Sequence, residues 1–389
     1  MVRHPRPDYL GRKDANVTQN SDPEVAQMIW QAGVDAVSGD ASVSLALSAL
    51  STRPPDQIIA VGKAASAMTQ AAIRHFRYSG PALVVTKYGH GSGLPAPARV
   101  IEAAHPVPDE NSLLAGRALV RAVRDMKPDG HLLVLVSGGA SSLAELPREG
   151  LTLKDLADEN NRMLAAGLDI HAMNAHRKTL SQIKGGQLLG QFRGASVTVL
   201  AISDVQGDDL SVIGSGIGSA PDGAAYDFDA HIVASNSVAR AAATDRARTL
   251  GLTVLDNAET LYGNVSDLAP TIGQHLRASR RGVHILGGEP TVVLPENPGQ
   301  GGRNQALALM LAREISGTSG LTVLVAGTDG SDGPTNAAGA IINGTTWTQS
   351  AQRAIREADS GRWLDQRDAV LRTGPTGTNV MDLLVAVRT

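Results

Sequence analysis

The sequence predicts a two-domain α/β protein whose larger first domain holds a mostly parallel sheet. At 389 residues the chain exceeds the usual size of one domain and suits two. Short apolar runs alternate with stretches of helical periodicity, which is typical of parallel strands whose connecting helices cover both faces of a sheet. The hydrophobic content of 42% supplies a sizeable core, and the aromatic content of 3% means that Ala, Val, Leu and Ile build it.

The first domain is predicted over residues 23–275, after a polar tail at residues 1–22. Helical periodicity begins at Pro23 and extends to Leu50. The predicted strands that follow are Gln57–Gly62, Ala82–Thr86, Arg99–Ala103, His131–Ser137, Ser196–Ser203, His231–Ser235 and Leu252–Leu255. The predicted helices are Ala65–Arg77, Leu113–Asp125, Leu153–Ala166, Asn174–Leu189 and Ser237–Leu250, with another near residues 265–280.

The second domain is predicted over residues 276–389, where the alternating pattern starts again. Its predicted strands are Val283–Leu286, Thr291–Leu294, Leu321–Ala326, Gly339–Ile342 and Leu383–Val387, and its predicted helices are Asn304–Glu314 and Thr346–Glu357. This domain is therefore the smaller of the two and is also α/β.

Charge and composition exclude several classes of protein. The net charge of −3 and the lack of a basic stripe argue against a nucleic-acid binder. No apolar run approaches the ~18 residues of a membrane span, and the polar start lacks the apolar segment of a signal peptide. Without cysteine there is no disulfide, thiolate metal site or Cys nucleophile. We therefore expect a cytoplasmic protein that acts on small molecules, with a homodimer left open.

The first of three Gly-rich turns places a lysine at a helix start. In IIAVGKAASAM a strand ends near Gly62, and Lys63 stands in the first turn of the next helix. A cation there is repelled by the positive end of the helix dipole, and a bound anion would offset this repulsion. The turn does not match a Walker A loop. We expect a phosphate or carboxylate beside Lys63, and the alternative is a solvated lysine.

Two further turns have the composition of anion-binding loops. The apolar strand HLLVLVS leads into GGASS, whose small side chains let backbone N–H groups approach a ligand. In NPGQGGRNQ two glycines precede Arg303 at another helix start, and a guanidinium suits a bidentate grip on a carboxylate or phosphate. A tight strand–helix turn in the first case and a surface loop in the second are the alternatives.

Two carboxylate clusters follow predicted strands. SDVQGDD contains Asp204, Asp208 and Asp209, and GTDGSDGPT contains Asp329 and Asp332. Carboxylates beside phosphate-binding turns need Mg²⁺ to offset repulsion, and Mg²⁺ takes one or two carboxylates together with phosphate oxygens. Because Asp-Gly pairs also form ordinary turns, a purely structural role is the alternative. Cations at helix starts, small-residue loops and turn carboxylates together predict phosphoryl transfer.

Several segments resemble the type II glycerate kinases, in the order found in that family: VGKAASAM, AAHPVPDENS, VLVSGGASSL, LSQIKGGQL, SDVQGDD, GGEPTV, GGRNQ, TDGSDGPTNAAGA and TGPTGTNVMDL. The resemblance runs from about Ile58 to the C-terminus. It implies a large Rossmann-like glycerate-kinase N-terminal domain, a smaller MOFRL C-terminal domain and an active site in the cleft between them. It also implies ATP and Mg²⁺ as cofactors, and phosphorylation of D-glycerate at the 2-hydroxyl.

The resemblance assigns individual residues as well. Lys63 and Arg303 match the family's essential basic residues, one from each domain. Its nucleotide-binding segments contain Gly62, Ser137, Gly138, Gly139, Ser141, Lys184, Asp204 and Asn236. Its cleft motifs contain His105, Asp329 and Asp332.

These assignments lead to a mechanistic hypothesis. The GGASS loop and Mg²⁺ hold the ATP phosphates, while Lys63 and Lys184 neutralise the transferring charge. Arg303 grips the glycerate carboxylate and so places the adjacent 2-hydroxyl in line with the γ-phosphate. Asp204 or Asp329 takes the hydroxyl proton or holds the metal, and the sequence leaves both assignments open.

Two departures from the family leave other functions open. The SDVQGDD motif continues as LSVIGSGIGSAPD, which differs from the family's Ser-Gly-Pro-Thr ending at Ile217–Pro221, and Ala306 replaces a glutamate. A kinase of a related hydroxy acid, such as erythronate or tartrate, is one alternative. An NAD(P)H-dependent hydroxypyruvate reductase is another, although the G-x-G-x-x-G fingerprint is absent. A nucleotide-binding regulator without turnover is the third.

Overall fold

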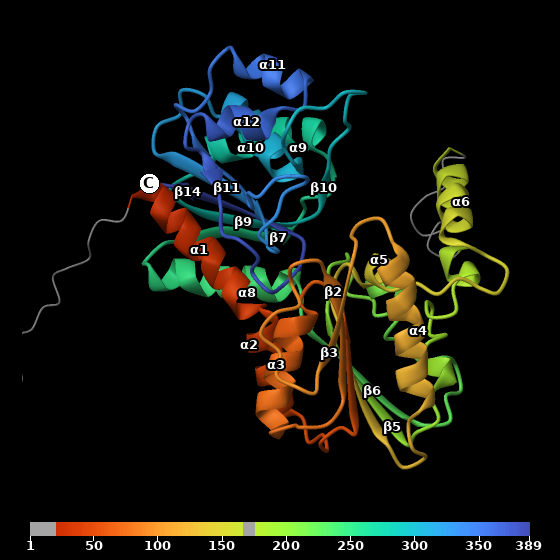
Figure 1. Ribbon diagram of the computed structural model, residues 1–389. Coiled ribbons are helices and arrows are strands. Elements are labelled where there is room, and N and C mark those ends of the chain that lie inside the picture. The colour runs from red at the N-terminus through yellow and green to blue at the C-terminus, as the bar shows by residue number, and fades with distance from the viewer. Residues whose placement is uncertain (1–20, 166–175) are drawn as a thin grey trace, which may run out of the picture.

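A computed structural model describes residues 21–165 and 176–389 and contains two six-stranded sheets, one in each lobe (Figure 1). The first sheet has the order β3-β2-β1-β4-β5-β6 and is parallel throughout. This is the Rossmann-like order, in which the loops after the central neighbours β1 and β4 diverge and leave a crevice for ligands. Its strands are β1 (Gln57–Val61), β2 (Ala82–Lys87), β3 (Arg99–Ala103), β4 (His131–Val136), β5 (Ser196–Ile202) and β6 (Asp227–Ala234).

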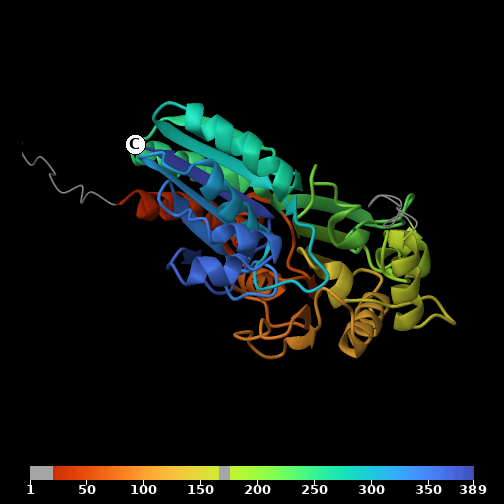
Figure 2. The ribbon, with the colours of Figure 1, turned by 90° about the horizontal axis from the view of Figure 1, so that it is seen from above.

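Helices cover both faces of the first sheet because alternate side chains of each strand enter different cores. In β4, Leu133 and Leu135 enter the core that contains α2 and α3, whereas Leu132 and Val134 pack with α4. Figures 1 and 2 place α6 at the end of this lobe that is far from the second sheet. The helices are α2 (Gly39–Ala49), α3 (Ala65–Phe76), α4 (Glu110–Arg124), α5 (Ala140–Leu143) and α6 (Leu153–Ala165), with 3₁₀ turns at Leu189–Gln191 and Ile213–Gly216.

The second sheet is mixed and has the order β13-β12-β11-β14-β9-β7. Within it only β7 and β9 pair in parallel. Its strands are β7 (Val254–Glu259), β9 (Gly282–Gly288), β11 (Leu321–Gly327), β12 (Gly339–Asn343), β13 (Val370–Leu371) and β14 (Asp382–Arg388), and β8 (Gly263–Asn264) pairs separately with β10 (Pro290–Thr291). One face packs against α9 (Val265–Ala278) and α10 (Arg303–Glu314), with α11 (Ala351–Arg356) and α12 (Ser360–Asp365) beside them, and the other packs against α1 (Asp22–Ala36) and α8 (Asn236–Thr249).

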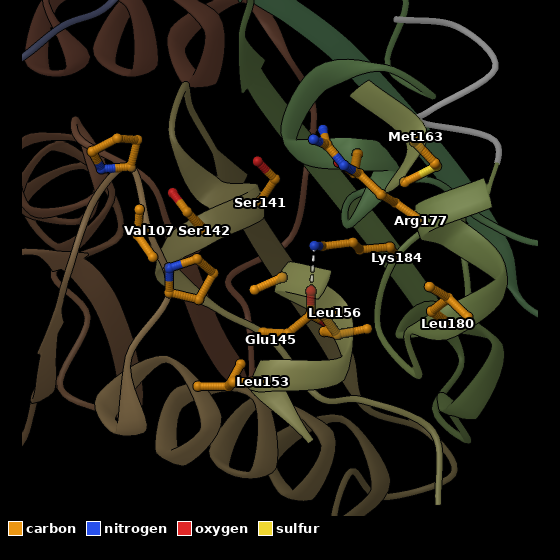
Figure 3. Close-up of a pocket in the computed structure, with 14 residues that line it drawn as sticks. Val107, Ser141, Ser142, Glu145, Leu153, Leu156, Met163, Arg177, Leu180 and Lys184 are labelled. Atoms are coloured by element: carbon orange, nitrogen blue, oxygen red, sulfur yellow. Dashed lines mark hydrogen bonds and ion pairs between the residues drawn. The ribbon is translucent and has the colours of Figure 1, made fainter. Parts of the chain in front are cut away.

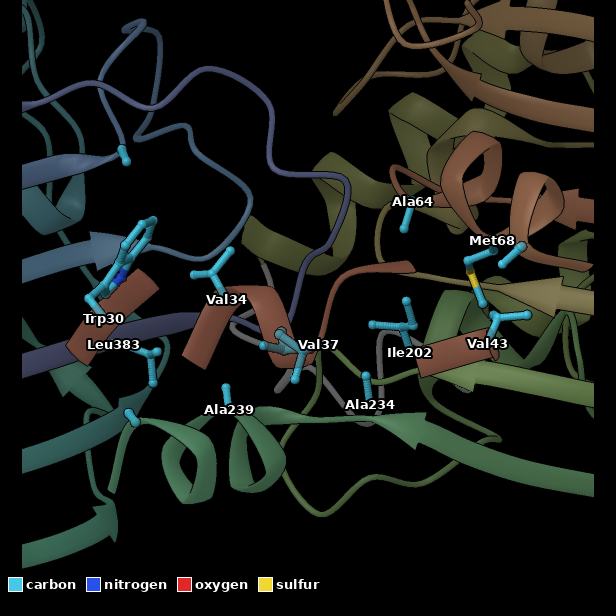
Figure 4. Packing of buried hydrophobic residues seen from close by; sticks show 14 of the residues in the cluster. Trp30, Val34, Val37, Val43, Ala64, Met68, Ile202, Ala234, Ala239 and Leu383 are labelled. Carbon is cyan, nitrogen blue, oxygen red and sulfur yellow. The ribbon is translucent and has the colours of Figure 1, made fainter. Parts of the chain in front are cut away.

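One apolar core joins the two sheets (Figure 4). Trp30 and Val34 from α1 and Ala239 from α8 pack there with Leu383 of the second sheet, and the same core includes Ile202 of the first sheet. Figure 1 shows α1 and α8 on the side of the second sheet that is nearer the first lobe. The lobes are therefore held in place by burial of apolar surface that both share.

Local sequence explains where α1 begins and how closely it packs. The Ser21 backbone N–H donates to Glu24 Oε2 (2.8 Å) in a capping box, which satisfies a donor at the helix start. At Gly33 a side chain has no room, because an added Cβ would lie 2.8 Å from the Ala239 carbonyl oxygen of α8. Glycine thus permits the close contact of these two helices.

The chain enters the second sheet earlier than predicted. The predicted strand Leu252–Leu255 forms as β7 and pairs with β9, so it does not join the first sheet. Residue 275, the predicted boundary, lies inside α9, which packs on the second sheet. Helix α1 also packs there although it precedes every strand of the first sheet. We therefore propose that each element is assigned to the lobe whose sheet it packs against, and that no single residue divides the two domains.

The predicted helix Asn174–Leu189 does not form as predicted. Its first residues lie outside the described ranges, and beyond Leu180 the chain leaves the helical conformation. Ser181 forms an isolated bridge with Pro147, and Gly185 and Gly186 have φ of 59° and 82°, which a helix does not allow. The helix is therefore already lost at Ser181, and the two glycines keep it from resuming before Leu189.

Two predicted elements of the second lobe are shorter than expected. The strand Thr291–Leu294 is reduced to β10; Val292 packs against the core of the second lobe, whereas Val293 and Leu294 are 81% and 54% exposed. The helix Thr346–Glu357 forms only as α11, and the short elements α12 and β13 carry no periodic signal long enough to predict them. Among the described residues, no helix has the length and apolar content to cross a membrane.

We predict that Trp30→Ala lowers the free energy of unfolding by about 3–5 kcal/mol, because it removes a fully buried indole from the core shared by the lobes. Trp30→Phe is the matched control. It keeps most of the apolar volume and removes an indole N–H that finds no hydrogen-bond partner within the described ranges. Urea denaturation measures both variants. A Trp30→Ala protein within about 1 kcal/mol of wild type would show that the shared core does not depend on α1.

Candidate active site

The loops after β1 and β4 are bonded to each other at the crevice of the first sheet. Lys63 N donates to the Gly138 carbonyl (2.9 Å), and Ala64 N donates to Ser137 Oγ (3.0 Å). Gly62 has φ of 132°, and a Cβ there would fall 2.1 Å from Ser137 Oγ, so glycine is required. Because Ser137 is fully buried, it fixes the loops to one another and does not face a ligand.

Lys63 forms an ion pair that links the two lobes. The Lys63 ammonium lies 2.8 Å from Asp329 Oδ2 in the loop after β11, and both side chains are less than one-fifth exposed. Burial raises the pKa of Asp329, but the Lys63 ammonium outweighs it, and the pKa lies below its usual value. Ser331 N also donates to Asp329 Oδ1 (2.9 Å). The anion expected beside Lys63 is thus present as a carboxylate of the second lobe.

Arg303 is held by two carboxylates of its own lobe. Its Nε lies 2.6 Å from Asp382 Oδ2 and its Nη2 lies 3.3 Å from Asp382 Oδ1, while Nη1 lies 2.9 Å from Glu289 Oε1. Burial would lower the pKa of Arg303, but Asp382 raises it further, so the guanidinium stays charged. Burial raises the pKa of Glu289 despite Arg303. A third carboxylate would have to displace Glu289, which is about half exposed.

Asp332 caps a helix and does not face the crevice. Its carboxylate accepts the backbone N–H groups of Asn304 (3.0 Å) and Gln305 (2.8 Å) at the start of α10. It is 2% exposed, and burial raises its pKa to about 7. The anion that the GGRNQ turn was expected to bind is therefore supplied by the chain itself.

Asp204 lies against the GGASS loop. A Cβ on Gly138 would lie 2.3 Å from Asp204 Oδ2, so the carboxylate approaches the backbone closely only because residue 138 is glycine. Asn379 Nδ2 lies 3.3 Å from the same oxygen and reaches it from the second lobe. Burial raises the pKa of Asp204 to about 6, the charge of Glu289 adds to this, and Lys63 opposes it.

His105 stands beside the same loop as a neutral side chain. Burial lowers its pKa to about 4, and the nearby Lys63 and Lys87 ammonium groups lower it further. A Cβ on Gly139 would lie 3.1 Å from His105 Cδ2 and 3.3 Å from Lys63 Cγ. A neutral imidazole can accept or donate one hydrogen bond at this position without adding charge.

A cavity of about 420 Å³ opens next to the GGASS loop (Figure 3). In Figure 3 the serine hydroxyls and the basic side chains face the cavity from opposite sides. Lys184 pairs with the buried Glu145, which also accepts from Ser181 Oγ (2.6 Å), so the charge of Lys184 is already compensated. The cavity has a polar lining of Ser141, Ser142, Glu145, Arg177, Lys184 and Ser215. Its apolar lining consists of Pro106, Val107, Pro108, Leu153, Leu156, Ala157, Met163 and Leu180.

A second cavity, of about 220 Å³, lies between the lobes. Lys63, Lys87 and His90 line it from the first lobe, and Asp329 and Asn336 line it from the second, with Gly330, Ser331, Gly374, Pro375, Gly377 and Thr378. Burial, followed by the charge of Lys87, lowers the pKa of His90, which is therefore neutral at pH 7. Two ammonium groups face one carboxylate, so this cavity has net positive charge.

Asn236 links the lobes by hydrogen bonds and lines neither cavity. Its Nδ2 donates to the carbonyl oxygens of Val380 (3.0 Å) and Asp382 (3.1 Å), and its Oδ1 accepts from Arg240 Nε (2.8 Å). It is 1% exposed. The structure thus brings Lys63, Asp204, His105 and Asp329 together, whereas the Asn236 side chain is bonded to the backbone of Val380 and Asp382.

Sequence reasoning missed several residues of this site. Glu289, Asn379 and Asp382 lie in the segments GGEPTV and TGTNVMDL, which were recognised as motifs without singling out these positions. Glu145 and Lys87 carried no signal, because a lone charge at a strand or helix end has an equally good interpretation as a solvated side chain. Only the fold shows which partner each one meets.

Both parts of the chain match known families. Residues 25–249 match the family described as Domain of unknown function (DUF4147), and residues 282–382 match the MOFRL family. The D-glycerate 2-kinase of Thermotoga maritima is 35% identical over 94% of this chain and 99% of that protein. The chain belongs to the type II glycerate kinase family.

Other members of the glycerate kinase family agree in sequence and structure. The glycerate 2-kinase of Pyrococcus horikoshii is 34% identical over 85% of this chain and 87% of its own length. The crystal structure of the glycerate kinase from Thermotoga maritima superposes with a TM-score of 0.82 at 32% identity, over 94% of this chain and 99% of that chain. A protein from Agrobacterium vitis, named a hydroxypyruvate reductase only provisionally, is 37% identical over 84% of this chain and 97% of its length.

We predict that Lys63→Ala lowers kcat/KM of the kinase reaction at least about 100-fold, because a charged group aimed at transferring charge contributes about 3 kcal/mol. Lys63→Arg should restore only part of the activity, since a guanidinium is a wide fork and not a compact charge. Lys127→Ala, at an exposed position after α4, is the matched control and should behave like wild type. Near-normal turnover by Lys63→Ala would reduce Lys63 to a structural partner of Asp329.

Proposed function

We propose that this chain transfers the γ-phosphoryl group of ATP to the 2-hydroxyl of D-glycerate and releases 2-phosphoglycerate and ADP. The observation that carries the proposal is the position of Lys63. Its backbone bonds to the GGASS loop beside the first cavity, and its ammonium lines the second cavity. A nucleotide in one cavity and a small acid in the other would therefore meet at this cation.

The first cavity suits the nucleotide. Its apolar lining from α6 and Leu180 offers a surface for a purine base, and Ser141 and Ser142 stand at the polar side that leads toward Lys63. Its volume of about 420 Å³ lies in the range of small-molecule sites. The neutral His105 beside Gly139 adds a hydrogen-bonding group near the phosphates without repelling or attracting them by charge.

The carboxylates fit the Mg²⁺ that phosphoryl transfer from ATP uses. Asp204 and Glu289 bring carboxylate oxygens close to the crevice, where the charge of Glu289 adds to the effect of burial on the pKa of Asp204. Hard oxygen donors are what Mg²⁺ prefers. Asp329, whose lowered pKa keeps it ionised, is the residue that we expect to hold the ion, which leaves Asp204 free to act as a base. When bound, Mg²⁺ neutralises charge on the ATP phosphates.

We assign the glycerate carboxylate to the second cavity, beside Lys87 and His90. This cavity has net positive charge and a volume that suits a three-carbon acid. Arg303 lines neither cavity, and Asp382 and Glu289 already occupy its guanidinium. We therefore propose that Arg303 positions these carboxylates, in place of the substrate grip that the sequence predicted.

The environments of the two aspartates favour Asp204 as the proton acceptor. Its pKa of about 6 makes it a stronger base than Asp329, whose pKa Lys63 lowers. In the proposed step the 2-oxygen of glycerate forms a bond to the γ-phosphorus and the bond from that phosphorus to the ADP oxygen breaks. The hydroxyl proton passes to Asp204, and Lys63 stabilises the charge on the transferring group.

None of the residues that depart from the family, Ile217–Pro221 and Ala306, lines the cavity proposed for the acceptor. Ile217 is fully buried in the core of the first lobe, and Ala306 is buried on α10 against the second sheet. Neither lines the second cavity. Their effect is on packing, so they do not by themselves favour erythronate or tartrate over glycerate.

We also propose that the chain works in the cytoplasm and as a homodimer. Composition and the small-molecule substrates support the first statement. Light scattering of the purified protein tests the second, with the mass of two chains expected.

The direct test of the function is ADP release in the presence of ATP, Mg²⁺ and D-glycerate, with erythronate, tartrate and hydroxypyruvate in parallel. D-Glycerate should give the highest kcat/KM, excess EDTA should stop turnover, and ³¹P NMR should show 2-phosphoglycerate. Lys87→Ala should raise the KM for glycerate about 10- to 100-fold with little change for ATP, because it removes a charged hydrogen-bond donor. Lys87→Arg keeps the charge and is the control.

Three results would contradict this assignment. Predominant 3-phosphoglycerate would mean that the carboxylate lies elsewhere. A Lys87→Ala enzyme with normal kinetics, beside an Arg303→Ala enzyme with a raised KM for glycerate, would return the carboxylate to Arg303. If the protein oxidises NADH in the presence of hydroxypyruvate and releases no ADP, it is a reductase and not a kinase.

We predict that kcat/KM rises with pH through about pH 6 and is level above it, because the base must be ionised and the pKa of Asp204 is about 6. Asp204→Asn should lower kcat at least about 100-fold and remove the inflection from the residual activity. The measurement is a pH profile between pH 5 and about 8. A profile that is flat over this range, or an inflection that persists in Asp204→Asn, would assign the proton to another group.

A further inference from the structure

A cluster of metal-ligating side chains lies in the second lobe and lines neither of the two cavities. Asp256 Oδ2 lies 2.7 Å from His275 Nε2 and 2.6 Å from His284 Nδ1. The three ligand atoms lie within 4.8 Å of one another, and no other group of three such side chains does so in residues 21–165 and 176–389. The kinase reaction proposed above uses none of the three.

The fold assembles this cluster from three separate elements. Asp256 on β7 pairs directly with His284 on β9, and His275 comes from the last turn of α9, which packs on the same face of the sheet. His284 is almost fully buried, whereas Asp256 is about one-third exposed and His275 more than half exposed. The cluster is therefore exposed to solvent on the side of His275 and buried against the sheet on the side of His284.

A bulge in β7 aims Asp256 at this position. Residues 254 and 256 of a regular strand share a face, yet Val254 packs in the core between the lobes, whereas Ala258 packs on the α9 side. The pairing slips by one residue between Val254 and Asp256, so Leu255 is the extra residue of the bulge. The bulge moves Asp256 to the face that His284 and α9 occupy.

We propose that Asp256, His275 and His284 form a binding site for a divalent transition metal of the zinc class. Two imidazoles and a carboxylate are a common ligand set for Zn²⁺, and water completes such sites as the fourth ligand. Tetrahedral ligands at about 2.0–2.1 Å from the metal stand about 3.3 Å apart. The two observed separations from Asp256 Oδ2, 2.7 and 2.6 Å, need to open by about 0.6–0.7 Å. Small rotations of the partly exposed Asp256 and His275 side chains would provide this.

Both histidines now converge on a single carboxylate oxygen. In this arrangement each ring directs a nitrogen at Asp256 Oδ2, which is where a shared cation would replace the two bridging protons. A metal at this point would link β7, β9 and α9, the elements at one edge of the second sheet. Binding to the folded chain alone raises its stability by mass action.

The test is a calorimetric titration of the chelator-treated full-length protein with ZnCl₂, together with the Tm at each Zn²⁺ concentration. Wild type should bind one Zn²⁺ per chain at this site and gain in Tm. His275→Ala should lose affinity at least about 10-fold together with the gain in Tm, since it deletes one of three ligands. Because His275 is exposed, this variant should fold, and Asp256→Asn provides a second deletion with the shape retained.

Two controls separate this site from others. His75→Ala removes an exposed histidine from the last turn of α3 and should bind Zn²⁺ like wild type. Asp329→Asn should also leave this binding unchanged, which distinguishes the site from the proposed Mg²⁺ position in the crevice. Wild type that binds no Zn²⁺, or Zn²⁺ binding that survives both His275→Ala and Asp256→Asn, would overturn the proposal. Neither readout depends on kinase activity.

Discussion

The apolar core that α1 and α8 share with both sheets is the constraint on which the rest of the structure depends. It fixes the second lobe over the carboxyl edge of the first sheet, so that Asp329 reaches Lys63 and Asn379 reaches Asp204. Each of these contacts joins residues that are far apart in the chain. If the lobes were joined only by a linker, side-chain entropy and solvent screening would leave such polar contacts weak. The packed core therefore makes the polar site possible.

Burial gives similar side chains different chemical roles at this site. Asp204, Asp329 and Asp332 all follow strands, yet the pKa of Asp329 is lowered by Lys63, whereas burial raises the pKa of Asp204 and Asp332. The carboxylate of Asp332 caps the start of α10, whereas that of Asp204 lies beside the GGASS loop, where we propose that it acts as the base. Arg303 is likewise charged but already paired. The division of roles follows from partners and desolvation, which residue type alone does not determine.

The sequence predicted the first sheet and the position of the crevice well. Apolar runs such as HLLVLV identify strands buried on both faces, and the turns after Val61 and Val136 carry the residues that meet at the crevice. The sequence could not predict that β7 and α1 complete the second lobe, because periodicity reports which face is apolar and not what covers it. It could not assign Arg303 either, since its partners Glu289 and Asp382 become neighbours only through the second sheet.

The central claim is that nucleotide and acid occupy two cavities that meet at Lys63. A crystal structure of the enzyme with Mg²⁺, a non-hydrolysable ATP analogue and D-glycerate tests it most directly. The account predicts the purine in the cavity lined by α6 and Leu180, the terminal phosphate beside Lys63, and the glycerate carboxylate beside Lys87. A nucleotide seated between the lobes beside Lys87, or glycerate bound to Arg303 in place of Glu289, would contradict it.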